Sequence, residues 1–291
     1  MMNSDKNAIV ILCYNDCDTS IEYIKRIIKY DSIHYFIVID NGSLQQKRKC
    51  LEQRLKKINS EKVIYIKNDK NVGYARGNNI GIRYAISKLE ADNIIVSNTD
   101  VIYSEKTLIE CINFLNKHES VGLVSPTMVT PDGKKCMPAW KLPNYMQLLW
   151  NSLFVLKKIY NPQEYKNLSG KSSKVDVLPG SLLIGKAKVW AAVGGFDEDT
   201  FLYGEESLLA YKIMKKGYSN YLLNNVSYVH AHSTIINNNV KSFYKKMKYL
   251  YEANKIFNQK CIRTNILQDI FYFISSYINI GLMYIYQLLK R

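Results

Sequence analysis

One heptapeptide constrains the fold more than any other stretch: Ile94-Ile95-Val96-Ser97-Asn98-Thr99-Asp100. Its apolar start is typical of a strand that is buried on both faces of a parallel sheet. Its polar end would then lie at the carboxyl edge of the sheet, where open α/β sheets bind their ligands. Asp100, beside Asn98 and Thr99, offers the oxygen ligands that a hard divalent cation prefers. A solvated turn explains the same residues, so both interpretations stay open for this stretch alone.

The charge of the chain limits its partners. A formal net charge of +15 at pH 7 favours an anionic partner, such as nucleic acid, a phosphate-bearing substrate or anionic lipid. No helix-turn-helix, zinc-finger or RNA-binding signature is present, so we expect no nucleic-acid partner. Residues 241–291 hold nine Lys and Arg against Glu252 and Asp269, in the region that also contains the most apolar segment. That distribution favours an anionic membrane surface.

The cysteines and the start of the chain indicate a cytoplasmic protein. None of the six cysteines belongs to a C-x-x-C pair. We therefore expect buried or incidental thiols in a reducing cytoplasm, and no structural zinc. Residues 1–7 are polar and lack the apolar core of an export signal.

Strand-like and helix-like segments alternate over the first third of the chain. Strands are expected at 8–13, 34–39, 62–66 and 93–97, with helices near 19–28, 44–58 and from 71 onward. This alternation predicts βαβ units and an α/β fold with a Rossmann-like, mostly parallel central sheet and flanking helices. Further on, Ser104 is expected to cap a helix, and the aromatic stretch 140–171 to form partly helical cover over the site.

Three predicted strands end in polar residues that would meet at one edge of the sheet. The ends are Tyr14-Asn15, Asp40-Asn41 and Asn98-Thr99-Asp100. Such convergence suits a nucleotide, because carboxylates can accept from a base and amides can meet ribose and phosphate. The G-x-G-x-x-G and G-x-x-x-x-G-K-[ST] motifs are absent. The sequence therefore argues against a dinucleotide oxidoreductase and against a P-loop enzyme.

Two later motifs carry titratable side chains. Glu205 and Glu206 open a predicted helix, where they either complement the helix dipole or supply a general base. His230 and His232 alternate at the end of a predicted strand, which places both rings on one side, as in many metal sites. A single histidine there would more often be structural.

The chain, with these motifs in order, resembles the family-two inverting glycosyltransferases with the A-type glycosyltransferase fold, in particular the bacterial rhamnosyltransferase-like branch. Seven motifs carry the resemblance: Tyr14-Asn15 after the first strand, I-V-I-D-N-G-S ending at Ser43, N-V-G-Y-A-R-G-N-N-I-G ending at Gly81, S-N-T-D ending at Asp100, G-G-F-D-E ending at Glu198, F-L-Y-G-E-E ending at Glu206, and H-A-H-S ending at Ser233. Each motif alone is weak evidence for the family, whereas seven motifs in the family's order are specific for it.

The resemblance implies which residues bind the donor. Asp40 would contact the nucleotide base, and Asn78 with the glycines around it would border the ribose and diphosphate. The full implied set for the nucleotide sugar is Tyr14, Asn15, Asp40, Asn41, Gly73, Asn78, Asn98 and Asp100.

The resemblance also implies the metal and the base. Asp100 would bind Mn²⁺ or Mg²⁺ together with His230 or His232, of which we prefer His230. Glu206 stands where the family has an Asp base, with Glu205 as its nearest competitor. Leu208 replaces a second family Asp.

The implied activity is that of an inverting, metal-dependent hexosyltransferase-type enzyme. It would move a sugar from a nucleoside-diphosphate donor to a hydroxyl of a glycan or polyprenyl-diphosphate-linked acceptor, in bacterial surface polysaccharide or capsule synthesis. Residues 1–240 would form the catalytic domain, with a nucleotide-sugar half at about 1–120 and an acceptor half at about 121–240. The alternative is a non-catalytic nucleotide-sugar-binding or partner subunit of a glycosyltransferase complex, because Glu206 and Leu208 depart from the family pattern.

Residues 241–291 are expected to form a C-terminal helical extension. The stretch 266–289 is long enough to cross a bilayer. It is interrupted by five polar residues: Asp269, Ser275, Ser276, Asn279 and Gln287. An interfacial helix with a basic flank is therefore the preferred prediction, which would place the protein peripherally on the inner face of the cell membrane. A helix packed on the catalytic domain is the alternative.

Overall fold

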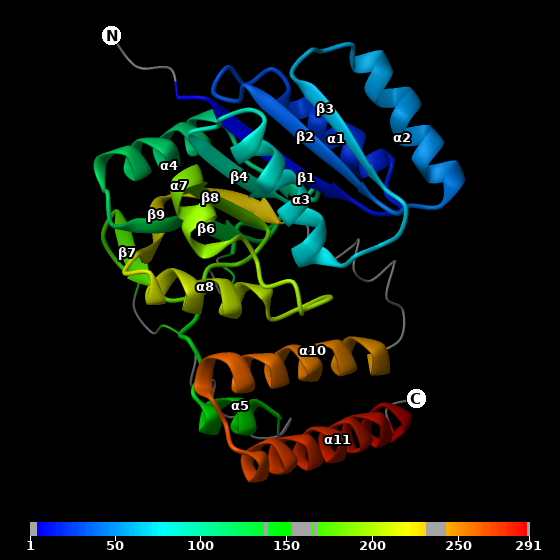
Figure 1. Cartoon of the computed structure of the whole chain (residues 1–291), viewed down its shortest axis with the longest axis vertical. Coiled ribbons are helices and arrows are strands. Elements are labelled where there is room, and N and C mark those ends of the chain that lie inside the picture. Colours follow the sequence, from blue (N-terminus) through cyan, green and yellow to red (C-terminus); the bar gives the residue numbers. More distant parts are fainter. Residues whose placement is uncertain are drawn as a thin grey trace.

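Alternating strands and helices build the first half of the fold, as Figure 1 shows. In the computed structural model, residues 5–134, 136, 139–152, 165, 168–230 and 243–289 are described. The first elements are β1 (Asn7–Cys13), α1 (Asp18–Ile27), β2 (Tyr35–Asn41), α2 (Gln45–Ile58), β3 (Val63–Asn68), α3 (Tyr74–Ser87) and β4 (Asn93–Ser97). β1 pairs in parallel with β2 and β4, and β2 pairs in parallel with β3. The expected βαβ units of this half are confirmed.

The second half extends the same sheet with mixed pairing. Its elements are β5 (Val101–Ile102), α4 (Glu105–Lys117), β6 (Val121–Val129), α5 (Tyr145–Ser152), β7 (Ser172–Val175), β8 (Leu182–Lys186), α7 (Ala187–Val193), α8 (Glu205–Lys215) and β9 (Ser219–His230). β8 is antiparallel to β4 and β6, β6 is parallel to β9, and β5 and β7 are antiparallel to β9.

The sheet therefore has two characters. Within the described residues it has nine strands in the order β3-β2-β1-β4-β8-β6-β9-β5, with β7 paired to β9. The α/β fold class is confirmed, but the fully parallel part ends at β4. Antiparallel neighbours such as β4 and β8 need no crossover helix between them, which allows the second half to depart from the βαβ rule.

Both faces of the sheet are covered. Ile9 and Ile11 of β1 pack with α1, α2 and α4 on one face. Ala8 and Val10 pack with α3, α7 and α8 on the other face. Because both faces are dry, polar side chains can appear only where the strands end, and this places the candidate site at the carboxyl ends of β1, β2 and β4.

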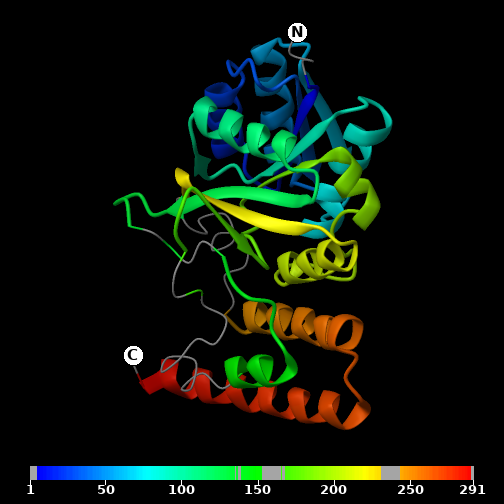
Figure 2. The same cartoon turned by 90° about the vertical axis from the view of Figure 1, so that its left-hand side faces the viewer.

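The C-terminal helices form a further layer. α10 (Phe243–Phe257) continues through a short π-helix, η1 (Asn258–Ile262), and is followed by α11 (Ile266–Leu289). Figures 1 and 2 show α10 between α8 and α11, with α11 at the outer edge of the molecule. A third apolar cluster joins these layers through Leu208 of α8, Tyr251 of α10 and Tyr272 of α11. We call α5, α10, η1 and α11 the C-terminal module.

The stretch 140–171 is partly helical, as expected, in the part that is described. Its helix α5 packs on α11: the Tyr145 hydroxyl donates to the Gln268 carbonyl at 2.9 Å, and the Ser152 and Ser275 hydroxyls are 3.0 Å apart. Buried Leu148 of α5 completes the apolar cluster of the module. The expected cover over the site stays a prediction. Residues 153–164 lie outside the described part of the chain.

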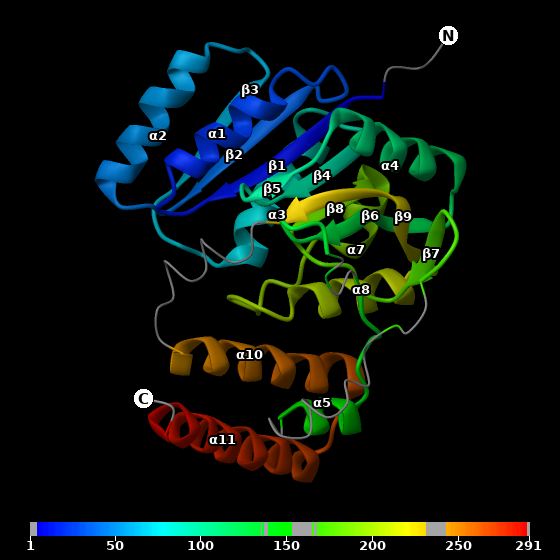
Figure 3. The same cartoon turned by 180° about the vertical axis from the view of Figure 1, so that it is seen from behind.

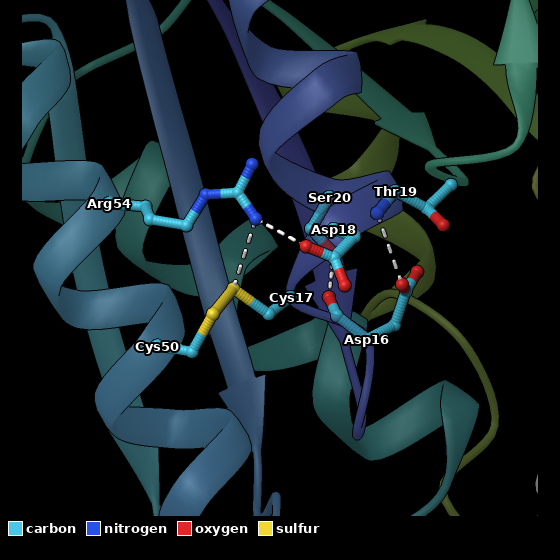
Figure 4. Close-up of a disulfide and its surroundings, with 7 residues drawn as sticks. All are labelled: Asp16, Cys17, Asp18, Thr19, Ser20, Cys50 and Arg54. Atoms are coloured by element: carbon cyan, nitrogen blue, oxygen red, sulfur yellow. Dashed lines mark hydrogen bonds and ion pairs between the residues drawn. A yellow bond between two sulfur atoms is a disulfide. The ribbon is translucent and has the colours of Figure 1, made fainter.

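Two cysteines form a disulfide, contrary to the expectation of free thiols. Figure 4 shows Cys17, just before α1, joined to Cys50 of α2. Their Cα atoms are 6.2 Å apart although the residues are 33 positions apart in sequence. The parallel pairing of β1 and β2 places α1 and α2 side by side, and this proximity could not be read from cysteine spacing.

We predict that thiol labelling of the denatured protein counts four thiols without reductant and six with it, because Cys13, Cys111, Cys136 and Cys261 lie outside the disulfide. Reduction should also lower the melting temperature. A cross-link of this span lowers the conformational entropy of the unfolded chain, which stabilises the folded protein by roughly 4 kcal/mol at most. A Cys50→Ser variant should give the same count under both conditions. Six thiols without reductant would contradict the disulfide.

Candidate functional site

The loops after β1 and β2 are tied together at the expected nucleotide edge. Asn15 adopts a left-handed backbone conformation with φ 54°. Its backbone N–H donates to the Ser43 hydroxyl at 2.8 Å, and its side-chain oxygen accepts from the Leu44 N–H at 2.8 Å. Tyr14 beside it is half-buried. The two strand ends therefore form one preorganised edge.

Asp40 is held firmly at the end of β2. Its carboxylate is fully buried and accepts from the Arg48 side chain at 2.6 Å, the Ser43 N–H at 3.0 Å and the Tyr65 hydroxyl at 3.3 Å. The hydrogen bond to Asp40 raises the pKa of the Arg48 guanidinium above its usual range. A carboxylate has about four acceptor positions, and these three donors occupy most of them.

Asn41 lies behind the edge rather than on it. Its side-chain amide donates to the Asn71 side chain at 3.0 Å and to the Gly73 carbonyl at 3.1 Å. Its oxygen accepts from the Asn68 side chain and the Val72 N–H, both at 3.2 Å. Asn41 therefore holds the turn that precedes α3.

Gly73 brings that turn against the segment before α8. It has φ +88°, and a Cβ there would lie 2.6 Å from the Phe201 carbonyl oxygen, so only glycine fits. The next residue, Tyr74, donates its backbone N–H to the same carbonyl at 2.9 Å. The loop expected to border the donor is thereby attached to the loop that leads to Glu205 and Glu206.

The two neighbouring asparagines of α3 have different partners. Asn78 is buried, and its amide donates to the Tyr74 carbonyl within the same helix at 3.0 Å. Asn79, which the sequence analysis did not single out, donates to the Phe196 carbonyl at 3.0 Å and to the Glu198 carboxylate at 2.9 Å. Asn79 thus anchors the G-G-F-D-E motif, whereas Asn78 braces the start of α3.

Asp100 and His230 meet as expected. β5 and β9 lie side by side in Figure 3, and they are paired with Val101 opposite His230. This register places Asp100 Oδ1 3.2 Å from His230 Nε2. The Asp100 carboxylate is buried, and its Oδ1 accepts no hydrogen bond from the described residues. Asn98 is half-buried, and its backbone N–H donates to the Ser181 carbonyl at 2.9 Å. His232 lies outside the described residues.

This pair has the chemistry of a partial metal site. A buried carboxylate oxygen without a hydrogen-bond donor, facing an imidazole, suits a divalent cation. Among the described residues, no group of three His, Cys, Asp or Glu side chains converges on one point. Mg²⁺ is commonly held by one or two protein groups, with water and substrate phosphates completing its shell. Asp100 and His230 fit that pattern.

The adjacent glutamates at the start of α8 have different surroundings. Glu205 is buried, and its Oε2 accepts no hydrogen bond from the described residues. Burial, together with the charge of Glu206, holds the pKa of the Glu205 carboxyl well above its usual range. Glu206 is half-buried. Burial also raises the pKa of the Glu206 carboxyl, while the backbone N–H groups of Glu206 and Gly180 oppose that shift.

Tyr74 and Gly180 connect the glutamates to the metal-type pair. The Tyr74 hydroxyl donates to the Gly180 carbonyl at 2.7 Å. A Cβ on Gly180 would lie 2.9 Å from Glu206 Oε1, so the absent side chain makes room for the carboxylate. Burial raises the pKa of the Tyr74 hydroxyl, and the nearby charges of Glu205, Glu206 and Asp100 raise it further. The Gly180–Ser181 segment thus contacts Tyr74 and Glu206 and, through the Ser181 carbonyl, the Asn98 N–H, which places Glu206 near the end of β4.

Comparison with known proteins agrees with this architecture. Residues 8–172 match the model for Glycosyl transferase family 2, which is more than half of the chain. The chain belongs to glycosyl transferase family 2.

Two curated proteins of known name are similar to this family member. The low-salt glycan biosynthesis hexosyltransferase Agl10 of Haloferax volcanii is 25% identical over 213 residues, which cover 73% of this chain and 62% of the relative. The N-acetylglucosaminyl-diphospho-decaprenol L-rhamnosyltransferase of Mycobacterium tuberculosis is 26% identical over 149 residues, covering 49% of this chain and 48% of the relative. The chain thus spans between about half and three fifths of the length of these relatives.

A solved structure shares the fold. The mannosyltransferase PcManGT from Pyrobaculum calidifontis, in complex with GDP-Man and Mn²⁺, superposes with a TM-score of 0.59 and 15% identity. The superposition covers 94% of this chain and 69% of that one. It confirms the A-type glycosyltransferase fold for this family member.

The replacement of the family's second Asp by Leu208 has a structural explanation. Leu208 is 1% exposed and packs in the apolar cluster with Tyr251, Phe257 and Tyr272 of the C-terminal module. A carboxylate at this position would be buried among these apolar side chains, which is costly without a partner. Leu208 therefore belongs to the contact between α8 and the module, and Glu205 and Glu206 supply the carboxylates at this helix start.

We predict a pH-dependent stabilisation by Glu205→Gln. In the unfolded chain Glu205 loses its proton near pH 4.5, whereas the buried group keeps it to higher pH. Each pH unit between these two pKa values costs about 1.4 kcal/mol of folding free energy. Glu205→Gln should therefore raise the melting temperature above that of the unchanged protein at pH 8 but hardly at pH 4.5.

Glu198→Gln is the control, for which we expect a change in melting temperature of the opposite sign. Hydrogen bonds from Arg83 and Asn79 lower the pKa of the Glu198 carboxyl, so its contribution to stability is present at neutral pH and is lost as the pH falls. Thermal scans across this pH range measure both variants. A Glu205→Gln protein that melts lower than the unchanged protein at pH 8 would mean that Glu205 is charged and paired.

Proposed function

We propose that this chain is an inverting glycosyltransferase that moves a hexose-type or rhamnose-type sugar from a nucleoside-diphosphate donor to a hydroxyl of a glycan or a polyprenyl-diphosphate-linked acceptor. Synthesis of a bacterial surface polysaccharide at the inner face of the cell membrane is the setting that we propose. The observation that carries the proposal is the buried Asp100–His230 pair, with Glu206 and the Asn98 N–H both held against the Gly180–Ser181 segment nearby. The names of the curated relatives support the class of reaction, and the decaprenol-linked substrate in one name supports the class of acceptor.

The donor would lie along the edge formed by the ends of β1, β2 and β4. Asp40, held by Arg48 and Ser43, marks the end of β2 at which the nucleotide base would lie. Asn15 and Tyr14 would border the base, and the tied loops keep this edge in place before the donor arrives. Preorganisation of this kind reduces the entropy lost on binding.

Asp100 and His230 would hold Mn²⁺ or Mg²⁺ at the diphosphate. When bound, the cation supplies positive charge that stabilises the leaving nucleoside diphosphate. The side chains fit this use because Asp100 Oδ1 is buried and accepts no hydrogen bond from the described residues.

Glu206 would act as the general base. Its raised pKa lies closer to physiological pH than that of an exposed glutamate, which suits proton removal from the acceptor hydroxyl. The acceptor oxygen would attack C1 of the sugar as its proton passes to Glu206, and one direct displacement would invert the anomeric configuration. Burial and the charge of Glu206 raise the pKa of Glu205 well above its usual range, which would favour its protonated form beside the attacking oxygen.

Turnover of a panel of nucleotide sugars with Mn²⁺ present tests this proposal. We expect Glu206→Gln to lower turnover by ~10²-fold or more while donor-induced thermal stabilisation is retained, because the change removes basicity and keeps shape. In the unchanged enzyme, turnover should rise with pH as Glu206 loses its proton. Glu61→Gln, at an exposed position remote from α8, is the matched control.

Two outcomes would overturn parts of the proposal. Thermal stabilisation by a donor without transfer or hydrolysis in the unchanged protein would favour the non-catalytic nucleotide-sugar-binding or partner subunit, which Leu208 makes worth testing. Normal turnover by Glu206→Gln in an active enzyme would place the base elsewhere.

A further inference from the structure

The outer half of α11 is a continuous apolar surface. Its large side chains are between 45% and 75% exposed: Ile266, Leu267, Ile270, Phe271, Phe273, Ile274, Tyr277, Ile278, Leu282 and Ile285. At 3.6 residues per turn these positions fall on one half of the helix. We call them the outer face of α11. An apolar surface of this extent is unusual on a protein that meets only water.

Three of the polar residues that interrupt the sequence of α11 lie on its opposite half. Ser275, Ser276 and Asn279 are all buried. The Ser275 hydroxyl is 3.0 Å from that of Ser152 in α5, and the Asn279 amide donates to the Tyr251 hydroxyl of α10 at 2.5 Å. The linear sequence mixes the two halves, whereas the helix places Ser275, Ser276 and Asn279 on the packed inner face and leaves an apolar outer face.

This division is incompatible with a helix surrounded by lipid. Only 22% of the window Ile266–Met283 is buried in the protein, yet its inner face is committed to α5 and α10 through hydrogen bonds. Figures 1 and 2 show α10 running alongside α11. If α11 crossed a bilayer, α10 would be carried into the hydrocarbon with its exposed Lys248, Glu252 and Lys255, at high cost. A helix lying along the membrane plane avoids that cost.

Charge favours an anionic leaflet over a second copy of the chain. The segment 241–291 has nine cationic residues, and both of its carboxylates have partners inside the module. Glu252 pairs with Lys248 at 3.8 Å, and Asp269 accepts from the Gln259 side chain at 2.9 Å. Two copies joined through α11 would bring two basic modules together, whereas anionic headgroups would neutralise them.

We propose that α11 lies in the plane of a membrane, with its outer face in the hydrocarbon of one anionic leaflet and its inner face packed on α5 and α10. This proposal names the surface of the proposed enzyme that meets the membrane. It rests on the proposed function only in assuming that the acceptor is linked to a lipid.

The module also connects the leaflet to the site. Lys260 of η1 contacts the Asp197 carboxylate at 2.8 Å and the Asp199 carboxylate at 2.6 Å. The rings of Tyr249 in α10 and Phe201 are 5.2 Å apart. A Cβ on Gly204 would lie 2.7 Å from the Ala253 Cβ, so α10 meets the loop directly before Glu205. Docking of α11 would therefore set the height of the Glu206 loop above the lipid headgroups.

Vesicle flotation of the full chain tests the proposal without any donor or turnover. We expect the protein to float with vesicles made of equal parts phosphatidylcholine and phosphatidylglycerol, and much less with phosphatidylcholine alone. Added salt and alkaline carbonate should release it, because an in-plane helix is held by one apolar face and by charge. Ile274→Glu and Ile278→Glu should each weaken partitioning about tenfold or more, since each removes an inserted side chain.

Ile109→Glu is the matched control, because Ile109 of α4 is also exposed, at 41%, and lies outside the module. Its flotation should equal that of the unchanged protein, and all variants should melt at similar temperatures.

Flotation that resists carbonate would mean that α11 spans the bilayer. A dimer in light scattering that Ile274→Glu dissociates, without vesicle binding, would assign the outer face to a second copy. Unchanged flotation of both outer-face variants would show that another surface meets the membrane. A failed transfer assay with intact flotation would refute the proposed function and leave this surface standing.

Discussion

Strands that are buried on both faces can carry polar side chains only where they leave the sheet. β1, β2 and β4 follow this rule: their interiors are apolar and dry, and Asn15, Asp40 and Asp100 appear at or just after their carboxyl ends. The same dryness determines the chemistry at that edge. It raises the pKa of both Glu205 and Glu206 and leaves a carboxylate oxygen of Asp100 beside His230.

The sequence predicted those parts of the fold and site that depend on local pattern. Apolar runs located β1 to β4, and Ser104 caps α4 as expected, accepting from the Thr107 N–H at 3.2 Å. The meeting of Asp100 with His230 was implied by the resemblance to the family, which assigns both residues to the metal, and local pattern alone did not predict it. Local pattern failed where neighbours in sequence diverge in space: Asn78 and Asn79 look alike in a motif, yet only Asn79 holds the segment before Glu198. Likewise, Cys17 and Cys50 meet only because α1 and α2 pack together.

The C-terminal module could not be placed from its sequence because its meaning depends on which face each residue occupies. Read along the chain, Ser275 and Asn279 weaken a membrane helix. In the folded protein they bind α5 and α10 and leave the outer face of α11 uninterrupted. The fold explains Leu208 in the same way. This residue departs from the family pattern because its side chain packs against residues of α10 and α11. The inner face of α11 is thus packed on α5 and α10, and the interfacial helix stays a prediction for its outer face.

The central claim is that the polar edge of the sheet is a single metal-assisted site for a nucleoside diphosphate. Anomalous diffraction from crystals of the chain grown with Mn²⁺ and a nucleoside diphosphate tests it most directly. The account predicts one strong manganese peak within bonding distance of Asp100 Oδ1 and His230 Nε2, with the diphosphate on its open side and the base towards Asp40. A manganese-bound diphosphate held elsewhere, with Asp100 and His230 still facing each other without the ion, would contradict it.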